Sequence, residues 1–403
     1  MIYSTSDITN LITYWHNISR FFICYNNFMN NNQHITPDIL IVGAGISGIA
    51  LARLLAEKDY SVLVIDKRPH IGGNCYDYKD ENGIIIHKYG PHIFRTDNKE
   101  VWQFLSRFTE WQEYKHKVRA IIDSKEVPIP FNFTSIDILF DAQKAKIFEE
   151  KLISKYGENK KIPILKLKQS TDKDLQELAA FVYEKVFYHY TLKQWGLKPE
   201  ELDGDALARV PVYTSYYDGY FTEKYQAIPK NGYTKMFENI LKHPNIKVQL
   251  NTDFKDLKNI KYKNLFYSGP IDEYFDHKLG PLPYRSLNFE FKTLPQKQFQ
   301  DVAVVNYTGQ EPYTRITEFK HFLNEETSST TIAYEYPSAF ELGKNERYYP
   351  IPKQENEQLY KRYLELAGKE KNIYFIGRLG EYKYYSMHSA VAAIFELVKK
   401  FAT

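Results

Sequence analysis

The chain has 403 residues, of which 43% are hydrophobic and 26% charged, and its formal net charge at pH 7 is +3. This length suits two or three domains, and the mixed charges create no basic field that would by itself attract nucleic acid. No apolar run reaches the roughly 18 to 20 residues of a transmembrane segment. Two cysteines, Cys24 and Cys75, are too few for a disulfide framework or a metal cluster. We therefore expect a cytoplasmic protein without a metal site.

Residues 1–36 differ from the rest of the chain. Apolar side chains recur at helical spacing from Ile8 to Phe22, and an asparagine-rich linker follows them. The segment lacks the basic start and the cleavage site of a signal peptide. It could be an amphipathic docking helix, but we favour a dispensable extension, with a downstream start such as Met29.

From Asp38 the sequence alternates strand and helix. Residues 38–42 (DILIV) indicate a buried strand, residues 46–58 a helix, and residues 61–66 (SVLVID) a second strand. This order predicts a βαβ unit with two parallel strands.

A glycine-rich turn lies between the first strand and the helix. Gly43, Gly45 and Gly48 have the spacing G-x-G-x-x-G, which allows a tight turn, the close approach of a pyrophosphate and close packing of helix on strand. Asp66 ends the next strand, where a carboxylate can bind ribose hydroxyls. The pattern predicts a dinucleotide site.

Further along the chain the pattern changes twice. Residues 140–202 have helical periodicity, and residues 287–336 contain several strand-like runs separated by turn residues. Residues 372–377 (NIYFIG) indicate one more strand, and residues 387–401 a final amphipathic helix.

Two segments favour FAD over NAD as the dinucleotide. Residues 66–74 (DKRPHIGGN) resemble the adenine-dinucleotide segment of FAD-containing, oxidase-like flavoproteins. Residues 375–380 (FIGRLG) end a strand with backbone N–H groups that could face the flavin and its phosphate.

We therefore expect an α/β fold with a Rossmann-like FAD-binding domain built from separated segments, a helical insertion domain and an antiparallel β-sheet domain. The FAD-binding domain would comprise residues 37–115, 225–275 and 355–403. The helical domain, with a mobile substrate loop, would comprise residues 136–208, and the sheet domain residues 116–135, 209–224 and 276–354.

A series of motifs resembles one family. HKYGPHIF, YTLKQWG, RVPV, IPKNGYTKM, YSGPIDEYFD, YRSLNFE, PYTRITE, YEYP, YYPI and GRLGEYKYYSM occur in the same order as in bacterial UDP-galactopyranose mutases. The resemblance extends from about Asp38 to the C-terminus.

The resemblance implies a non-redox flavoenzyme that interconverts UDP-galactopyranose and UDP-galactofuranose for furanose-containing surface glycans such as a capsule. In that family the FAD must be reduced, and its N5 atom attacks the anomeric carbon as UDP leaves. Bacterial relatives suggest a homodimer. The alternative is an FAD-dependent oxidoreductase of the amine oxidase type, which would share the glycine-rich turn.

Most of the expected substrate-binding residues match family positions. Arg209 and Arg315 match the diphosphate-binding arginines, whose forked donors suit phosphate oxygens. Tyr349 and Tyr384 match the phosphate-binding tyrosines, Tyr190 matches the uracil-stacking tyrosine, and Trp195 matches the tryptophan of the mobile loop. We expect Phe187 and Tyr220 to line the same cleft.

Other matches lie nearer the flavin. His92 matches a histidine beside the flavin ring, and Arg285, Glu335 and Arg378 match positions near flavin and sugar; we interpret Glu335 as a positioning carboxylate. The residues expected to hold FAD are Gly43, Gly45, Ile46, Ser47, Gly48, Asp66, Lys67, Gly73, Asn74, His92, Arg378 and Met387.

The chain departs from the family pattern at three positions near the sugar end. Arg95 replaces the second histidine of HIFHT, Tyr213 replaces an arginine that often follows RxPV, and Ser386 replaces a common aspartate. We hypothesise that Arg95 reaches the sugar pocket and lets the enzyme also accept UDP-N-acetylgalactosamine. The alternative, that Arg95 only pairs with a nearby carboxylate, stays open.

Overall fold

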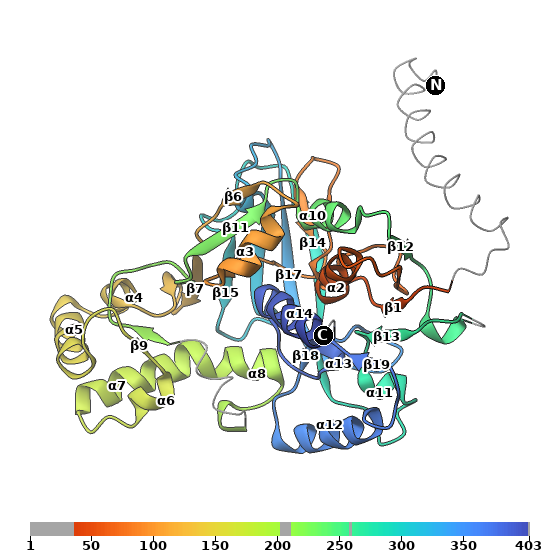
Figure 1. Ribbon diagram of the computed structural model, residues 1–403. Helices are drawn as coiled ribbons and strands as arrows, with labels where there is room; N and C mark the ends of the chain where they lie inside the picture. Colours follow the sequence, from red (N-terminus) through yellow and green to blue (C-terminus); the bar gives the residue numbers. More distant parts are fainter. Residues whose placement is uncertain (1–35, 202–210, 258–259, 402–403) are drawn as a thin grey trace, which may run out of the picture.

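The computed structural model describes residues 36–201, 211–257 and 260–401 (Figure 1). A five-stranded parallel sheet, in the order β12-β2-β1-β13-β19, lies on the right of Figure 1. Its central strands β2, β1 and β13 are short and largely buried on both faces, as parallel strands usually are, whereas the edge strands β12 and β19 are more exposed. The strands are β1 (Ile39–Val42), β2 (Val62–Ile65), β12 (Ile246–Gln249), β13 (Asn264–Tyr267) and β19 (Ile373–Phe375).

Three helices pack together beside this sheet. The predicted βα turn leads into α2 (Ile46–Ala56), which contacts α10 (Tyr233–Leu241) and the C-terminal helix α14 (Met387–Phe401). The apolar side chains of α14 recur three and four residues apart, so one face of the helix is buried. The predicted Rossmann-like α/β architecture is confirmed.

A seven-stranded sheet, in the order β18-β14-β17-β16-β15-β7-β8, lies beside the first one. We expected it to be antiparallel, but the pair β7 and β15 is parallel. The chain leaves the β7–β8 hairpin at residue 129, re-enters this sheet at β14 at residue 284 and reaches β15 at residue 304, and such a long connection allows parallel pairing. The strands are β7 (Val118–Ile122), β8 (Lys125–Ile129), β14 (Tyr284–Leu294), β15 (Val304–Tyr307), β16 (Arg315–Glu318), β17 (Thr330–Ala339) and β18 (Tyr349–Pro350).

The first part of this connection, residues 133–201, forms the helical segment on the left of Figure 1. A π-helical turn, Tyr183–Tyr188, joins α7 to α8 without a break. The helices are α4 (Phe133–Leu139), α5 (Ala142–Tyr156), α6 (Ile164–Lys168), α7 (Lys173–Val182) and α8 (His189–Trp195), followed by a 3-10 turn at Pro199–Glu201. A two-stranded sheet pairs β9 (Lys161–Ile162) with β10 (Val212–Tyr213).

Smaller elements complete the described structure. A three-stranded sheet contains β5 (Phe94–Thr96), β6 (Trp111–Glu113) and β11 (Tyr225–Pro229), and a hairpin pairs β3 (Asp77–Lys79) with β4 (Ile85–His87). The remaining α-helices are α3 (Lys99–Ser106), α11 (Ile271–Tyr274), α12 (Gln354–Ala367) and α13 (Gly377–Gly380). Further 3-10 turns are Gly73–Cys75, Phe254–Asp256 and Phe319–Phe322.

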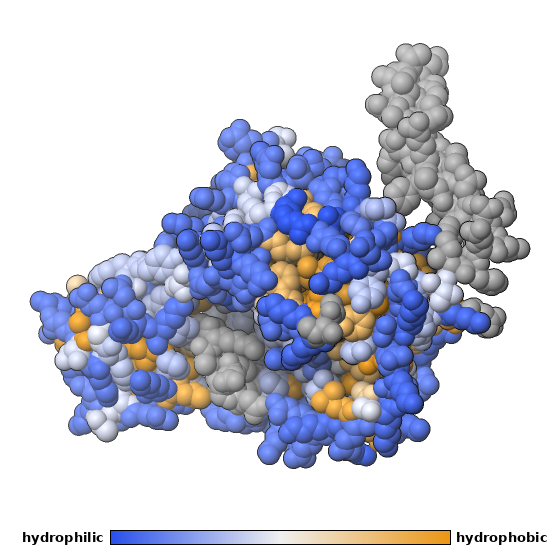
Figure 2. All heavy atoms as spheres, viewed as in Figure 1, coloured by the Kyte–Doolittle hydropathy of each residue, from blue (hydrophilic) through white to orange (hydrophobic). Residues whose placement is uncertain are grey.

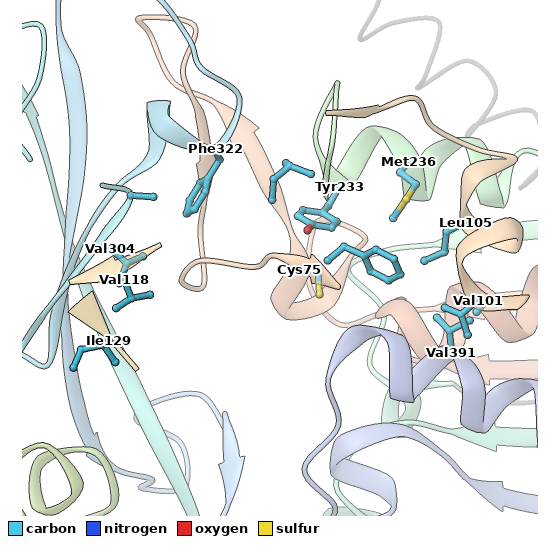
Figure 3. Packing of buried hydrophobic residues seen from close by; sticks show 14 of the residues in the cluster. Cys75, Val101, Leu105, Val118, Ile129, Tyr233, Met236, Val304, Phe322 and Val391 are labelled. Atoms are coloured by element: carbon cyan, nitrogen blue, oxygen red, sulfur yellow. The ribbon is translucent and has the colours of Figure 1, made fainter. Parts of the chain in front are cut away.

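One large hydrophobic cluster connects the two main sheets. It extends from Val118 and Val304 in the seven-stranded sheet, past Phe322, to Met236 of α10 and Val391 of α14 (Figure 3). On the face shown in Figure 2, most of the surface is hydrophilic, and apolar side chains gather where α2, α3 and α14 meet. The shared core fixes the two sheets relative to each other.

Some expectations concern parts outside this description. The N-terminal extension, apart from its last residue, and Arg209 lie outside the described residues. Across residues 36–201, 211–257 and 260–401, each helix is too short or too polar to cross a bilayer. The same residues contain no cluster of three or more histidine, cysteine or acidic side chains suited to a metal ion. The predicted domain boundaries stay a prediction.

A buried carboxylate joins β3 to the start of α10. Asp77 is 3% exposed, and its two oxygens accept hydrogen bonds from the backbone N–H groups of Tyr233 (2.5 Å) and Thr234 (2.8 Å). These are unpaired donors of the first helical turn, which α10 cannot satisfy itself because Gly232 at its N-cap has no side chain. Burial raises the pKa of Asp77, although these hydrogen bonds oppose the shift.

We expect Asp77→Asn to lower the free energy of unfolding by about 1–3 kcal/mol, because the amide keeps one acceptor oxygen and leaves a buried N–H unpaired. Urea unfolding would measure this loss. The control is Asp141→Asn, the same change at the exposed N-cap of α5, where asparagine caps as well as aspartate. Equal losses in the two variants would contradict the capping role of Asp77.

Two histidines lie in the interior. His87 of β4 stacks on Phe322 with ring centroids 5.1 Å apart, and His116, between β6 and β7, stacks on Phe221 at 5.6 Å. Burial, reinforced by neighbouring basic side chains, lowers the pKa of each imidazole from 6.5 to about 3. Both rings are therefore neutral at pH 7.

Because these pKa values are lower in the folded protein, the unfolded chain gains protons as the pH falls below 6.5 while the folded chain does not. We expect the free energy of unfolding to be level above about pH 7 and to fall toward pH 4 by ~1.4 kcal/mol per pH unit for each histidine. His116→Asn should reduce this slope by the share of one histidine in urea titrations at several pH values. An unchanged slope would show that His116 is not a buried neutral imidazole.

Candidate active site

A cleft of about 1350 Å³ lies between the parallel sheet and the seven-stranded sheet. Residues that follow the carboxyl ends of β1, β2, β13 and β19 line one side, which is where parallel α/β sheets bind ligands. Side chains of the seven-stranded sheet, α8 and the start of α14 line the rest. One continuous cleft thus reaches from the glycine-rich turn to the predicted substrate residues.

The glycine-rich turn is shaped to receive an anion. Gly43 has φ +105°, and a Cβ on Gly48 would lie 2.1 Å from the carbonyl oxygen of Gly43. Helix α2 begins behind Gly45, which has no side chain to cap it, so N–H groups of the first helical turn remain available. Asp66 accepts a hydrogen bond from the N–H of Ala44 at 2.7 Å and thereby fixes the turn against the end of β2.

A second glycine pair extends this surface. The Gly72 N–H donates to the Ala44 carbonyl (2.7 Å), and a Cβ on Gly73 would lie 3.0 Å from Gly45 Cα. The two glycine stretches therefore form one floor without side chains, which is long enough for a dinucleotide and not only for a mononucleotide. The predicted cofactor residues that line the cleft are Gly43, Gly45, Ile46, Ser47, Asp66, Lys67, Gly73, Asn74, His92, Arg378 and Met387.

Farther along the cleft, Arg315 is held by a buried carboxylate. Arg315 of β16 lies opposite Glu335 of β17, and its Nε and Nη2 donate to Glu335 Oε2 at 2.8 and 2.7 Å. Burial disfavours the charge of Arg315, but Glu335, which is 1% exposed, outweighs it and raises the pKa of Arg315. The guanidinium therefore keeps a fixed position and a full positive charge.

Aromatic rings surround this arginine. Tyr349 and Tyr384 stack with centroids 5.7 Å apart, and the guanidinium of Arg378 lies 5.3 and 5.2 Å from their ring centres. Tyr190 of α8 and Tyr220 also line the cleft. Flat rings and hydroxyls next to guanidinium groups suit a ligand that combines a base, a sugar and phosphates.

His92 is a neutral histidine in the cleft wall. Its Nδ1 lies 2.8 Å from the Gly90 carbonyl oxygen, and its backbone N–H donates to Nδ1 of His87 (3.0 Å). Burial lowers the pKa of His92 to about 4. A neutral ring next to a carbonyl carries its proton on Nδ1, so the Nε2 of His92 is an acceptor.

Arg95 pairs with a carboxylate and also lines the cleft, whereas its contact with the sugar stays a prediction. The structure places its guanidinium 4.2 Å from the ring centre of Phe221 and in an ion pair with Glu223, and all three residues line the cleft. Tyr213 and Ser386, the other two departures from the family pattern, line the same cleft. The three residues that depart from the family pattern therefore line the same cleft as the predicted substrate residues.

Five predicted residues are absent from the described residues that line the cleft. Glu335 stands behind Arg315, and Gly48 packs under the glycine turn. Arg285 donates to the carbonyls of Lys193 and Gln194 (3.0 and 2.9 Å) and so caps the end of α8. The last two are Phe187 and Trp195.

The placements of Phe187 and Trp195 follow from their helix. Phe187 is 5% exposed and belongs to the main hydrophobic cluster, because its position in the π turn faces the core rather than the cleft. Trp195 ends α8, with its ring centre 6.2 Å from that of Tyr349. Trp195 therefore does not line the cleft itself but packs near Tyr349, which does.

Sequence reasoning missed many cleft residues, among them His116 and Glu223. His116 and Glu223 both line the cleft, His116 because β7 pairs with β15, and Glu223 because β11 pairs with β5. The only local signal for Glu223 was its closeness to Tyr220 in the motif GYFTE. Nothing local indicated His116.

Comparisons with known proteins agree with this geometry. The family model for UDP-galactopyranose mutase matches residues 185–384, and a model for an NAD(P)-binding Rossmann-like domain matches residues 41–108. A solved structure of reduced UDP-galactopyranose mutase has a TM-score of 0.70 and covers 92% of this chain and 95% of its own; at 16% identity it shows the fold.

Curated relatives extend over nearly the full length. A probable UDP-galactopyranose mutase of Klebsiella pneumoniae is 40% identical over 377 residues, which are 93% of this chain and 95% of that protein. A dTDP-fucopyranose mutase of Escherichia coli is 36% identical over 366 residues, 89% of this chain and 96% of that protein. Identity at this level over nearly the whole chain, on the expected fold, establishes that the chain belongs to the UDP-galactopyranose mutase family of isomerases.

Proposed function

We propose that the protein converts UDP-galactopyranose to UDP-galactofuranose and back, with reduced FAD as its cofactor. The observation that carries this proposal is Arg315, fixed by Glu335 among cleft tyrosines, in the same cleft as the dinucleotide turn. A cofactor with a diphosphate and a substrate with a diphosphate would then lie next to each other.

The diphosphate of the substrate is the natural ligand of Arg315. Glu335 engages Nε and Nη2, and within the described residues no hydrogen-bond partner occupies Nη1. That donor is available for a phosphate oxygen, and a charge-assisted hydrogen bond of this kind is about twice as strong as a neutral one. Tyr190, Tyr349 and Tyr384 add hydroxyl groups and ring faces for the phosphates and the uracil base.

The residues present fit FAD: the N–H groups at the start of α2 would hold its pyrophosphate, and Asp66, at the end of β2, would bind a ribose. When bound in its reduced form, FAD supplies a nucleophilic nitrogen, N5, for the anomeric carbon of the sugar. The side chains of the protein bind and orient the cofactor and the substrate and neutralise their phosphate charges. Arg315 stabilises the negative charge that develops on UDP as its bond to the sugar breaks.

Glu335 has a positioning role in this proposal. Its carboxylate is 1% exposed and committed to Arg315, and Thr314 also donates to it at 3.3 Å. A carboxylate held in this way is poorly placed to exchange protons with a sugar. An oxidoreductase of the amine oxidase type would share the glycine turn but would leave the Arg315 arrangement without a role.

We further propose that the enzyme accepts UDP-N-acetylgalactosamine as well. Arg95 is fixed by Glu223 on one side and by the Phe221 ring beneath it, and its remaining N–H donors could bind the carbonyl of an acetamido group. The relative named dTDP-fucopyranose mutase is consistent with family members that differ in the sugar they take.

The cellular setting belongs to the same proposal. We infer a cytoplasmic homodimer whose product serves the assembly of furanose-containing surface polysaccharide such as a capsule, on the strength of the family resemblance. Light scattering of the purified protein in solution would test the dimer directly.

For the diphosphate site, we expect Arg315→Lys to weaken UDP binding by about 10- to 100-fold, because lysine keeps the charge but loses the fork held by Glu335. Titration with UDP, followed by flavin fluorescence, would measure the change. Arg107→Lys, at a surface ion pair with Glu57, is the matched control and should bind UDP like the wild type. Unchanged affinity in Arg315→Lys would contradict the assigned role.

For the sugar end, we expect Arg95→His to lower kcat/KM for UDP-N-acetylgalactosamine relative to UDP-galactose by about 5- to 10-fold, the value of one hydrogen bond. Product chromatography with dithionite-reduced enzyme and each sugar would measure the ratio. Equal sugar preference in the two proteins would refute the role of Arg95. Turnover without reduction, or with stoichiometric consumption of electrons, would instead favour the oxidoreductase.

A further inference from the structure

A loop of the seven-stranded sheet lines the cleft and contacts the residues that follow β2. Residues 342–347, between β17 and β18, line the cleft together with residues 66–68 and 252–254 and the segment around Glu273. We call residues 342–347 the strap. We propose that the strap is the outer wall of the adenosine end of the FAD site and sets how long FAD stays bound; this inference rests on the proposed cofactor.

Sheet topology locates the adenosine end. The pyrophosphate-binding turn follows β1, Asp66 follows β2, and Thr252 follows β12, which is the next strand in the sheet. A dinucleotide that places its pyrophosphate at β1 and its ribose at Asp66 therefore directs its adenine toward Thr252. The strap lies over this part of the cleft, since it contacts the residues after β2.

The first contact of the strap is an ion pair with a preorganised arginine. Arg68 donates to Asn74 Oδ1 at 3.0 Å, lies 4.6 Å from the ring centre of Tyr89, and bonds its backbone N–H to Asp66. Its Nη2 then reaches Glu346 of the strap at 2.8 Å. Since Arg68 is fixed on the cofactor side, the pair costs little ordering of its side chain.

In the second contact the charges are reversed, so that the strap supplies the arginine and the facing segment supplies the carboxylate. Arg347 of the strap donates from Nη1 to Glu273 Oε2 at 2.9 Å, and Lys67 lies 3.8 Å from the same carboxylate. Arg347 is 8% exposed and lies 4.3 Å from the ring centre of Phe340. Its Nη2 lies 3.9 Å from the buried carboxylate of Asp272, so α11 holds Arg347 through both Asp272 and Glu273.

The strap is ordered internally before it makes these contacts. The side chain of Asn345 accepts from the backbone N–H of Glu341 (2.8 Å) and donates to the carbonyl of Ala339 (2.9 Å). Two crossed ion pairs then connect it to the loops after β2 and β13. Opening the strap breaks both pairs together, and FAD would leave only while they are broken.

The decisive variant is Glu346→Gln, because Glu346 is half-exposed and its loss leaves the core intact. We expect holoenzyme diluted into buffer to release FAD about two- to fivefold faster than the wild type, the value of one exposed ion pair. Rising flavin fluorescence would report the release. Salt should speed release from the wild type and have less effect on the variant, since it screens the pair.

The matched control is Glu341→Gln. Glu341 directly precedes the strap and pairs with Lys344 of the strap, and among the described residues it contacts none on the cofactor side. The Glu341→Gln variant should therefore release FAD at the rate of the wild type. Glu346→Lys places like charges together at Arg68 and should release FAD faster than Glu346→Gln. Equal release rates in the wild type and both Glu346 variants would overturn the inference. If purified wild type bound no FAD, the proposed function would fail first.

Discussion

The architecture depends on one close approach of two backbone segments. The turn after β1 and the segment after β2 meet where a Cβ on Gly73 would touch Gly45, and within the turn itself a Cβ on Gly48 would collide with the Gly43 carbonyl. Only glycine permits both contacts. They leave a floor without side chains at the start of α2, and His92 and Arg68 line the same cleft.

The cleft solves an electrostatic problem with paired charges. In the proposed function two anionic diphosphates would occupy one cleft, although the net charge of the chain is only +3. Four arginines that line the cleft each have a carboxylate: Arg315 has Glu335, Arg95 has Glu223, Arg68 has Glu346 and Arg347 has Glu273. Arg378, which also lines the cleft, instead donates to the carbonyls of Tyr348 and Tyr385. Pairing fixes the orientation of the guanidinium groups and reduces the repulsion between these positive charges when no ligand is bound.

Local patterns predicted what is local. Hydrophobic periodicity and glycine spacing gave β1, α2, β2 and α14 because these signals come from adjacent residues. The parallel pairing of β7 with β15, the cap that Arg285 forms on α8 and the partner of Arg95 all join residues far apart in sequence. No local pattern encodes such pairings, so motif resemblance could name Arg285 as a site residue but could not say that it supports α8.

The π turn at Tyr183–Tyr188 has a consequence for the phase of the helix that carries the substrate residues. A π turn accommodates one more residue than an α turn, and each α-helical residue advances the side-chain direction by about 100°. Everything after the turn, including Tyr190, is therefore rotated relative to α7. The single extra residue lets one continuous helix bury Leu178 and Val182 in the core and still present Tyr190 to the cleft.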